Sequence, residues 1–527
     1  MPLVRFDRGR QEGAIGPDPD SFPLTRGSEM GESFFDAMSV LQTLSTLLVV
    51  VIGIVFLSIV VMYIVDVTQT QHTVRRNFPV IGRFRYMFEH MGEFFRQYFF
   101  AHDREEMPFN RAQRSWVYRA AKGLDGTVAF GSTLNLTPVG TPIFVNCPYP
   151  TLERDSSPTK PMTIGPHARR PYDAPSIFNV SAMSYGAISK PAVLALSNGS
   201  RMAGNWLNTG EGAISPWHLE GGADIVYQIG TAKYGVRDEN GDIDDAMLKT
   251  IGEIEQVRMI ELKLSQGAKP GKGGILPGGK VTAEIAEIRG IPAGEDSISP
   301  NRHPEINSAS DLLNVINHLR DVSGLPVGFK AVIGAYGWLD ELFVEIRKRG
   351  IESAPDFITV DSGDGGTGAA PMSLIDNVGL PIHESLPLVV DKLNAYGLRE
   401  RVKVIASGKL INPSDATWAL CVGADFINSA RGFMFALGCI QALQCNKNTC
   451  PTGVTTHDKR LQRGLVPADK AERVRRYSET MRQEIGIIAH SCGVAEPRQL
   501  RRYHCRIVQV DGRSIPLDEL YPGTPPM

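Results

Sequence analysis

Phe357-ITVDSGDGGT-Gly368 is a short apolar run that ends in an acidic, glycine-rich turn, and this pattern recurs along the chain. Helix-like stretches separate many of the repeats, and alternating strand and helix units favour a parallel sheet. Eight such units predict an α/β fold, a closed (β/α)8 TIM barrel, with an open doubly wound sheet as the alternative. The eight predicted strands are Ile177–Ser181, Asn205–Thr209, Asp224–Ile229, Met259–Leu264, Val327–Val332, Phe357–Asp361, Val402–Ala406 and Asp425–Ser429.

The bulk composition limits the class of protein. The chain has 527 residues, room for one large domain and additions, and its net charge of -2 gives no reason to expect a nucleic-acid partner. Four of the seven cysteines are scattered without a framework spacing: Cys147, Cys421, Cys492 and Cys505. Free thiols persist in a reducing compartment, so we expect the globular part to lie in one. The oligomeric state stays open, with a homo-oligomer among the alternatives.

The segment Leu44–Val65 contains 22 residues without a charge, and about 20 apolar residues span a bilayer. We predict a transmembrane helix over residues 40–66; a buried core helix and a cleaved signal peptide are the alternatives. The 20 residues before Leu44 contain one arginine, and the 20 after Val65 contain four: Arg75, Arg76, Arg83 and Arg85. The positive-inside rule therefore predicts a single-pass protein of the cell membrane whose catalytic domain is cytoplasmic.

The chain has four further predicted parts. Residues 1–39 form a polar tail, disordered up to residue 36, and residues 67–150 a membrane-proximal region; residues 151–480 form the barrel and residues 481–527 a C-terminal extension. In the membrane-proximal region, Phe84, Phe88, Met91, Phe95 and Tyr98 recur at three- and four-residue steps. This pattern predicts an amphipathic helix, which could lie on the membrane surface or dock on the main domain. Residues 101–150 are predicted to form an antiparallel prelude to the barrel.

Cys439, Cys445 and Cys450 lie within twelve residues, in the spacing C-x5-C-x4-C. Thiolates this close are soft ligands aimed at one point, which suits an iron–sulfur cluster or zinc. Three thiolates are one short of a closed tetrahedral zinc site, and His457 could supply the fourth ligand. Plain packing of the cysteines as small apolar residues is the other alternative. We favour the iron–sulfur cluster, which predicts a redox enzyme.

Gly363-Asp-Gly365-Gly-Thr-Gly368 formally matches the dinucleotide-binding pattern G-x-G-x-x-G, but it follows the sixth predicted strand and Pro371 comes soon after it. We interpret it as a backbone collar that approaches a flat ring or a phosphate closely, since glycine has no Cβ; a plain tight turn is the alternative. The loops after barrel strands 7 and 8 often bind phosphate. Here they read Ser407-Gly408-Lys409 and Ser429-Ala430-Arg431-Gly432, and could hold the phosphate of flavin mononucleotide (FMN), unless both cations are solvated surface charges.

Notable polar residues fall at or near the C-terminal ends of the predicted strands, where barrels carry their chemistry. They are Ser184, Glu211, Lys263, Gln266, Lys330, Asp364 and Ser407. Lys263 and Lys330 point into a crowded interior and need an anion or an electron-rich ring there, because a buried unpaired ammonium is costly. Lys269 and Arg289 could clamp a carboxylate, which arginine binds bidentately; surface salt bridges are the alternative.

Five motifs together resemble the FMN-binding domain of glutamate synthases over about residues 150–480. They are Ser181-AMSYGAIS-Lys190, Asn208-TGEGA-Ile214, Leu262-KLSQGAKPGKG-Gly274, Asp364-GGTGAAP-Met372 and the run from Cys439 to Gly453, in the family's order. The front of the chain, with Arg76-NFPVIGR-Phe84 and Pro108-FNRAQRSWVYR-Ala120, is similar to a short, membrane-attached branch known as FMN-binding glutamate synthase family proteins.

The resemblance implies a barrel that carries FMN and a [3Fe-4S] cluster on Cys439, Cys445 and Cys450. The implied reaction is reductive amination of 2-oxoglutarate to L-glutamate: ammonia condenses with the keto acid, and reduced FMN passes a hydride to the imine. Electrons would come through the cluster from ferredoxin or another donor protein. The implied FMN contacts are Ser184, Lys263, Lys330, Gly365, Gly366 and Thr367, with the phosphate near Ser407, Gly408 and Ala430. The implied keto-acid contacts are Glu211, Gln266, Lys269 and Arg289, with Glu211 and Lys269 as the catalytic candidates.

The chain also departs from the family. It starts Met-Pro-Leu instead of with a glutaminase domain and its N-terminal cysteine, so we expect ammonia to come free or from a partner subunit. The two phosphate loops read Ser-Gly-Lys and Ser-Ala-Arg in place of Asp-Gly-Gly and Phe-Gly-Thr, and no nicotinamide-binding domain is recognisable. Two alternatives stay open. One is a related FMN-dependent amino-acid or methylamine-glutamate oxidoreductase coupled to a membrane electron carrier; the other is a non-enzymatic membrane-tethered scaffold or redox sensor.

Overall fold

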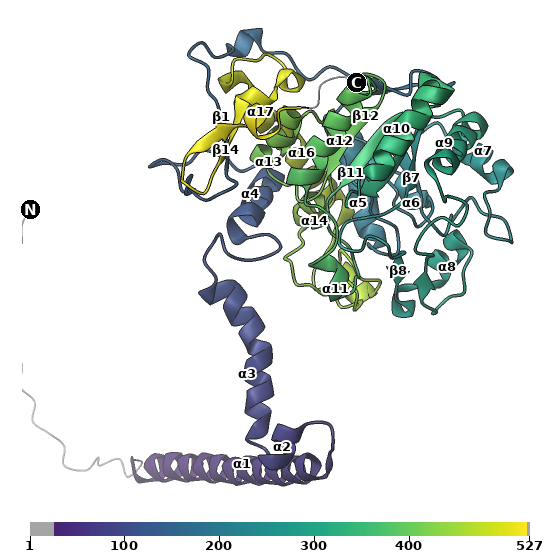
Figure 1. The fold of residues 1–527 in the computed structure, drawn as a ribbon. Coiled ribbons are helices and arrows are strands. Elements are labelled where there is room, and N and C mark those ends of the chain that lie inside the picture. Colours follow the sequence, from purple (N-terminus) through teal and green to yellow (C-terminus); the bar gives the residue numbers. More distant parts are fainter. Residues whose placement is uncertain (1–25, 524–527) are drawn as a thin grey trace, which may run out of the picture. The chain divides into compact units, whose positions relative to one another are not determined.

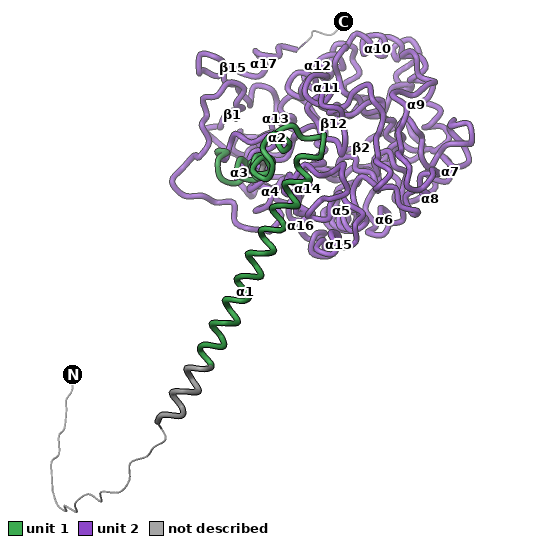
Figure 2. The backbone as a smooth tube through the Cα atoms, turned by 90° about the horizontal axis from the view of Figure 1, so that it is seen from below, with its two compact units in different colours: residues 1–102 green, residues 103–527 purple. Residues whose placement is uncertain are grey.

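The computed structural model describes residues 26–523. The chain divides into two compact units, residues 1–102 and residues 103–527, and each is described by itself (Figure 2). The second unit contains the barrel and the candidate site.

Eight parallel strands of the second unit close into a barrel, so the predicted barrel is confirmed and the open sheet is excluded (Figure 1). Neighbours pair in chain order, and the last strand pairs with the first through Asn428 and Asn179. The strands are β4 (Phe178–Val180), β5 (Leu207–Asn208), β6 (Ile225–Ile229), β7 (Val257–Lys263), β10 (Val327–Val332), β11 (Phe357–Asp361), β12 (Lys403–Ser407) and β13 (Phe426–Ser429). Each overlaps one of the eight predicted strands, and β10 and β11 have the predicted bounds.

Helices follow most of the strands and cover the outside of the barrel (Figure 1). Ser189, Ser308 and Asn412 cap α5, α9 and α13 by accepting hydrogen bonds from backbone N–H groups of the first turn. The helices of this unit are α4 (Arg111–Lys122), α5 (Lys190–Ala203), α6 (Pro216–Leu219), α7 (Asp245–Glu253), α8 (Ala283–Arg289), α9 (Ala309–Ser323), α10 (Gly337–Arg349), α11 (Met372–Ile375), α12 (Ile382–Ala395), α13 (Pro413–Val422), α14 (Arg431–Leu437), α15 (Lys459–Gln462), α16 (Pro467–Ser491) and α17 (Leu517–Leu520).

A polar hub lies inside the barrel, below the C-terminal strand ends. The Glu261 carboxylate on β7 is buried and accepts hydrogen bonds from Asn208 (2.9 Å), Gln228 (2.5 Å) and Thr359 (2.6 Å), each on a different strand. Because a buried carboxylate is tolerated only when its oxygens are satisfied, this hub ties four strands together. Two residues after Glu261 on β7, Lys263 pairs in register with Lys330 on β10. The two lysines therefore stand side by side at the C-terminal end of the barrel.

Long insertions decorate this end. Between β7 and β10 the chain forms a two-stranded antiparallel sheet, β8 (Ile275–Leu276) with β9 (Ser297–Ile298), and helix α8 between them. The sequence showed here only a glycine-rich loop followed by Arg289, which the structure places at the end of α8. Two shorter strands, β2 (Met162–Ile164) and β3 (Tyr172–Ala174), form a hairpin ahead of the barrel.

Residues 101–150 differ from the predicted antiparallel prelude. They contain α4, whose capping box joins Asn110 and Gln113, and a single short strand, β1 (Pro142–Phe144). The antiparallel partner of β1 comes from the far end of the chain: β14 (Cys505–Val508), which in turn pairs with β15 (Ser514–Pro516). The prediction failed because a partner more than 350 residues away leaves no local signal.

The first unit consists of helices: α1 (Arg26–Thr68), α2 (Thr73–Asn77), α3 (Gly82–Phe95) and a π-helical turn, η1 (Arg96–Phe100). Residues Asp36–Thr68 of α1 are long and apolar enough to cross a membrane; an 18-residue stretch within them has a mean hydropathy of 3.2 and no buried residue. The predicted amphipathic helix is confirmed as α3 and η1. Residues 26–36, predicted to be disordered, are helical, and residues 1–25 of the predicted tail lie outside the described residues.

Candidate active site

A cavity of about 580 Å³ opens at the C-terminal ends of the barrel strands. Every residue that the resemblance assigned to FMN, to the keto acid or to the [3Fe-4S] cluster lines it, whereas His457 of the zinc alternative does not. The assigned residues are Ser184, Glu211, Lys263, Gln266, Lys269, Arg289, Lys330, Gly365, Gly366, Thr367, Ser407, Gly408, Ala430, Cys439, Cys445 and Cys450. The fold thus brings together residues that are up to 266 positions apart in the sequence.

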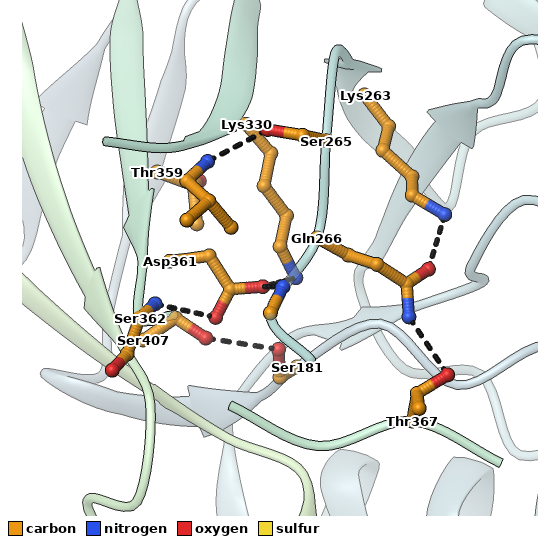
Figure 3. A network of polar contacts seen from close by, with 12 residues as sticks. Ser181, Lys263, Ser265, Gln266, Lys330, Thr359, Asp361, Ser362, Thr367 and Ser407 are labelled. Atoms are coloured by element: carbon orange, nitrogen blue, oxygen red, sulfur yellow. Dashed lines mark hydrogen bonds and ion pairs between the residues drawn. The ribbon is translucent and has the colours of Figure 1, made fainter. Parts of the chain in front are cut away.

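Lys330 forms the floor of the cavity together with a neighbouring carboxylate. Its ammonium lies 3.0 Å from Asp361, which also accepts hydrogen bonds from the backbone N–H groups of Gly267 and Ser362 (Figure 3). Burial would lower the pKa of Lys330, but the nearby Asp361 and Glu261 carboxylates outweigh burial and raise it. Lys330 is therefore positively charged at neutral pH, beside whatever occupies the cavity.

A second lysine connects the floor to the mouth. Lys263 Nζ lies 2.9 Å from the Glu211 carboxylate and donates to Gln266 Oε1. The Gln266 amide in turn donates to Thr367 Oγ1 (3.1 Å), on the glycine-rich loop after β11 (Figure 3). This chain of contacts runs from strand β7 across the cavity to the glycine-rich loop, so it fixes the positions of both walls.

Glu211 sits in a slot that two glycines leave open. A Cβ on Gly274 would clash with the Glu211 carboxylate, and a Cβ on Gly230 would lie 2.6 Å from Glu211 Cβ. Burial would raise the pKa of Glu211, but the charges of Lys263, Lys269 and Arg289 outweigh it and lower that pKa. Glu211 is therefore a carboxylate at neutral pH, held in one place among three cations.

Replacing Gly274 by alanine is expected to lower kcat/KM by about 100-fold with little loss of stability, because a carboxylate displaced by about 1 Å costs that much in a positioned site. The new methyl group meets the flexible end of Glu211, so the side chain moves and the backbone does not. Gly279→Ala is the matched control, because a Cβ there has no atom within 4 Å. Steady-state kinetics and thermal melts of both variants test this, and equal kcat/KM values would contradict it.

Lys269 and Arg289 are buried in the cavity wall, only 3% and 5% exposed, so the surface salt-bridge alternative is wrong. Arg289 donates to the Tyr185 carbonyl (3.0 Å), and its Nε is left without a partner. Within residues 26–523, neither cation forms a salt bridge with a carboxylate, although both lie near Glu211. Burial, and then the neighbouring Lys263, lower the pKa of Lys269 to about 8. Two desolvated cations that form no salt bridge are suited to bind an anion from outside.

The loops after β12 and β13 line another part of the cavity. Arg431 stacks on the Phe109 ring at 4.6 Å, and burial lowers its pKa to about 10; it is not a solvated surface charge. Lys409 is more exposed and pairs with Asp364 (2.9 Å). Beside them, Asn428 Oδ1 and Ser429 Oγ are buried without a partner within the described chain. An anionic ligand here could pair with Arg431 and accept a hydrogen bond from the Ser429 hydroxyl, whereas the Asn428 oxygen would need a donor.

The glycine-rich loop after β11 packs too closely for side chains. A Cβ on Gly267 would lie 2.6 Å from the Gly365 Cα, and one on Gly366 would lie 2.8 Å from Arg431 Nε. Only the four-residue α11 follows the loop, and it begins after Pro371. A dinucleotide fingerprint requires a long helix at this point, so the structure favours the predicted collar over that motif.

The three cysteines of the C-x5-C-x4-C run lie along one wall of the cavity. Among residues 26–523, no group of three or more His, Cys, Asp or Glu side chains is arranged to hold a single metal ion. His457, the fourth ligand of the zinc alternative, uses its Nε2 to contact the Gly186 carbonyl at 2.8 Å. Burial raises the pKa of Cys439 to about 12, while hydrogen bonds from Thr452 and Thr455 outweigh burial at Cys450 and lower its pKa.

Sequence reasoning missed the residues that hold this cysteine loop. The Gln441 side chain accepts from Phe109 N (3.2 Å) and donates to Phe109 O (3.0 Å), and Tyr118 donates to the Cys439 carbonyl (2.7 Å). Buried Lys280 donates to the Cys445 carbonyl (3.2 Å) and lies near the Cys445 and Cys450 thiols. Each of these contacts joins residues at least 165 positions apart, so no spacing rule could have found them.

The closed parallel barrel, its cavity at the C-terminal strand ends and its cluster of buried cations define the class of protein: a (β/α)8 enzyme for anionic ligands. Residues 151–495 match the family model described as the conserved region in glutamate synthase. The chain belongs to the glutamate synthase family, and the predicted class, a glutamate synthase-type FMN oxidoreductase, is confirmed.

The similar proteins match different fractions of this chain. The glutamate synthase large subunit-like protein YerD of Bacillus subtilis is 39% identical over 515 residues, 90% of this chain and 98% of that relative. The archaeal-type glutamate synthase [NADPH] of Dehalococcoides mccartyi is 33% identical over 345 residues, and the match covers only 65% of either protein. A crystal structure of mandelate oxidase with (S)-4-hydroxymandelic acid matches with 16% identity and a TM-score of 0.44, over 75% of this chain and 99% of that one.

Proposed function

We propose that the chain reductively aminates 2-oxoglutarate to L-glutamate. The observation that carries this proposal is the pair of buried cations, Lys269 and Arg289, which form no salt bridge among residues 26–523 and line the same cavity as Glu211. A dicarboxylate keto acid offers the anion that this pair lacks. Family membership and the named relatives support the same substrate.

FMN fits the rest of the cavity. Bound FMN would supply hydride to the substrate. Lys263 and Lys330 would lie beside its ring, where cations stabilise the reduced, anionic form. Ser184, Gly365, Gly366 and Thr367 would complete the ring contacts. Ser407, Gly408 and Ala430 would hold the phosphate, next to the Ser429 hydroxyl, which could donate a hydrogen bond to it.

The chain's own residues bind, orient and move protons. Arg289 and Lys269 would bind a carboxylate of the keto acid, and Gln266 would contact the substrate from its position between Lys263 and Thr367. Glu211, anionic at neutral pH, would attract ammonium and accept its proton, with Lys263 holding the carboxylate in place. Glu211 and Lys269 are therefore the proposed catalytic residues.

Cys439, Cys445 and Cys450 would carry a [3Fe-4S] cluster that brings single electrons to the site. Three cysteines that line one cavity would supply the three thiolate ligands of such a cluster. The cationic Lys280 beside two of them would offset the negative charge of the thiolates. Electrons would come from ferredoxin or another donor protein, and ammonia would come free or from a partner subunit.

Helix α1 would anchor the protein in the cell membrane, with the barrel in the cytoplasm and a homo-oligomer among the possible assemblies. The alternative function, a related amino-acid or methylamine-glutamate oxidoreductase coupled to a membrane electron carrier, draws its support from α1 alone. An anaerobic assay decides between them: the loaded protein, given ammonia and a reduced carrier, should form glutamate from 2-oxoglutarate. Turnover of other amino or keto acids with no glutamate formed would support the alternative.

The affinity for 2-oxoglutarate is expected to depend on pH through Lys269. Its pKa of about 8 means that the ammonium is present below pH 8 and is lost as pH rises above it. Binding should therefore be strongest below pH 8 and weaken by up to about tenfold per pH unit above it. Lys269→Arg should remove this inflection, because arginine stays charged. Calorimetric titration of FMN-loaded protein between pH 6 and pH 9.5 tests this, and constant affinity over the whole range would contradict it.

A further inference from the structure

The first unit carries an apolar face that no other part of its described residues covers. Exposed side chains on α3 and η1 are Phe84, Met87, Phe88, Phe94, Phe95, Tyr98, Phe99 and Phe100, with exposures between 39% and 74%. Within α3, helical spacing places Phe84, Phe88, Met91 and Phe95 along one side, and the Phe84 and Phe88 rings stack on each other. So large an aromatic face normally marks a binding surface.

The charges around this face have one predominant sign. Residues 66–100 contain five arginines, one aspartate and two glutamates, a net charge of +2 with histidine neutral. Arg85, Glu89 and Arg96 are exposed and occupy helical positions away from the aromatic side. An apolar face bordered by arginine favours a negatively charged partner surface.

A buried ion pair fixes the start of this helix at the end of α1. Asp66, 1% exposed, accepts a bidentate hydrogen bond from Arg83 (2.8 Å to each oxygen) and another from the backbone N–H of Val80 (3.0 Å). From this joint α3 runs across the direction of α1 (Figure 1). A helix that crosses a bilayer runs roughly along the membrane normal. Because α3 runs across the direction of α1, it would lie roughly parallel to the membrane plane.

We propose that α3 and η1 bind a lipid surface with anionic headgroups, with their aromatic face toward the acyl chains. This inference rests on the part of the proposed function that places α1 across the membrane. The ion pair at Asp66 holds the start of α3 next to the end of the candidate span, at the depth of the membrane–water interface. Aromatic side chains and arginines are suited to that interface. The chain would thus hold to the membrane by a span and by a second helix on its surface.

Tryptophan quenching by lipids brominated in their acyl chains tests this in the full-length chain. Phe88→Trp reports the aromatic face, and Glu89→Trp, one residue away on the polar side, is the matched control. Vesicles contain phosphatidylcholine and phosphatidylglycerol. We expect Phe88→Trp to be quenched at least about twofold beyond the wild type, whose five tryptophans all lie in the second unit, and Glu89→Trp to match the wild type. Vesicles without phosphatidylglycerol should reduce the quenching of Phe88→Trp.

Two further outcomes overturn the inference. Equal quenching of both variants would mean that the helix has no preferred face toward lipid. A Phe88→Trp emission that is blue-shifted but not quenched would mean that protein covers the face, either the second unit or another copy. Val50→Trp, in the middle of α1, separates this inference from the anchor: quenching there without quenching at position 88 removes the surface helix and leaves the span in place.

Discussion

Arg289→Met is expected to weaken the binding of 2-oxoglutarate by roughly 30- to 4000-fold and to leave FMN bound. The guanidinium is 5% exposed, and its removal would leave a substrate carboxylate buried without its partner. Truncating one member of such a pair costs about 2–5 kcal/mol. Arg289→Lys should give an intermediate loss, because lysine keeps the charge but not the bidentate geometry. Calorimetric titration of FMN-loaded variants with 2-oxoglutarate measures both effects.

Arg237 offers a matched control from the same neighbourhood. Its guanidinium stacks on the Tyr234 ring at 4.8 Å, as that of Arg289 does at 5.4 Å, but it does not line the cavity. Arg237→Met should therefore bind 2-oxoglutarate as the wild type does. Similar affinities for Arg289→Met and the wild type would show that Arg289 is not part of the substrate site. Loss of FMN from Arg289→Met would instead show that the cation belongs to the flavin.

The barrel was predictable because its signal is local. Val327–Val332 and Phe357–Asp361 are continuous, almost wholly buried runs, and each ends in a turn rich in glycine or serine, so chain order alone gives the pairing of parallel neighbours. The strand β1 has no such signal, because its partner β14 lies at the other end of the chain. The helix α4 is a different case: its capping box, Asn110 with Gln113, is a local signal that the prediction for residues 101–150 missed.

Some residues of the candidate site were likewise predictable from the sequence, and others were not. Residues at strand ends, such as Lys263 and Lys330, were found because the fold places all strand ends at one rim. The residues that position them were not found: Glu261 is invisible as a hub until Asn208, Gln228 and Thr359 surround it. The alternatives for Lys269 and Arg289 required burial to decide, and burial is a property of the folded chain.

Cys450→Ser is expected to remove the proposed cluster and to stop turnover driven by a reduced carrier protein. Among the three cysteines, Cys450 is the one whose pKa is lowered, by hydrogen bonds that outweigh its burial, so its thiolate is the most readily formed. A serine hydroxyl is a hard, weakly acidic ligand that does not replace a thiolate on iron. Mutation of a residue that only hydrogen-bonds to a metal ligand typically lowers metal affinity or activity by about 10–100-fold. For a ligand itself, we therefore expect carrier-driven turnover to fall by more than about 100-fold. FMN content should stay unchanged, since the flavin contacts lie on other elements.

Cys492→Ser is the control for this last prediction, because Cys492 is also buried but does not line the cavity. Iron and acid-labile sulfide analysis, flavin content and low-temperature EPR of the oxidised protein measure the cofactors, and chemical reduction of FMN by dithionite bypasses the cluster. Loss of iron and of carrier-driven turnover in Cys450→Ser alone, with FMN still reducible by dithionite, would assign electron delivery to the cysteine loop. Full carrier-driven turnover in Cys450→Ser would remove the cluster from the proposed function and leave an FMN enzyme that receives its electrons directly.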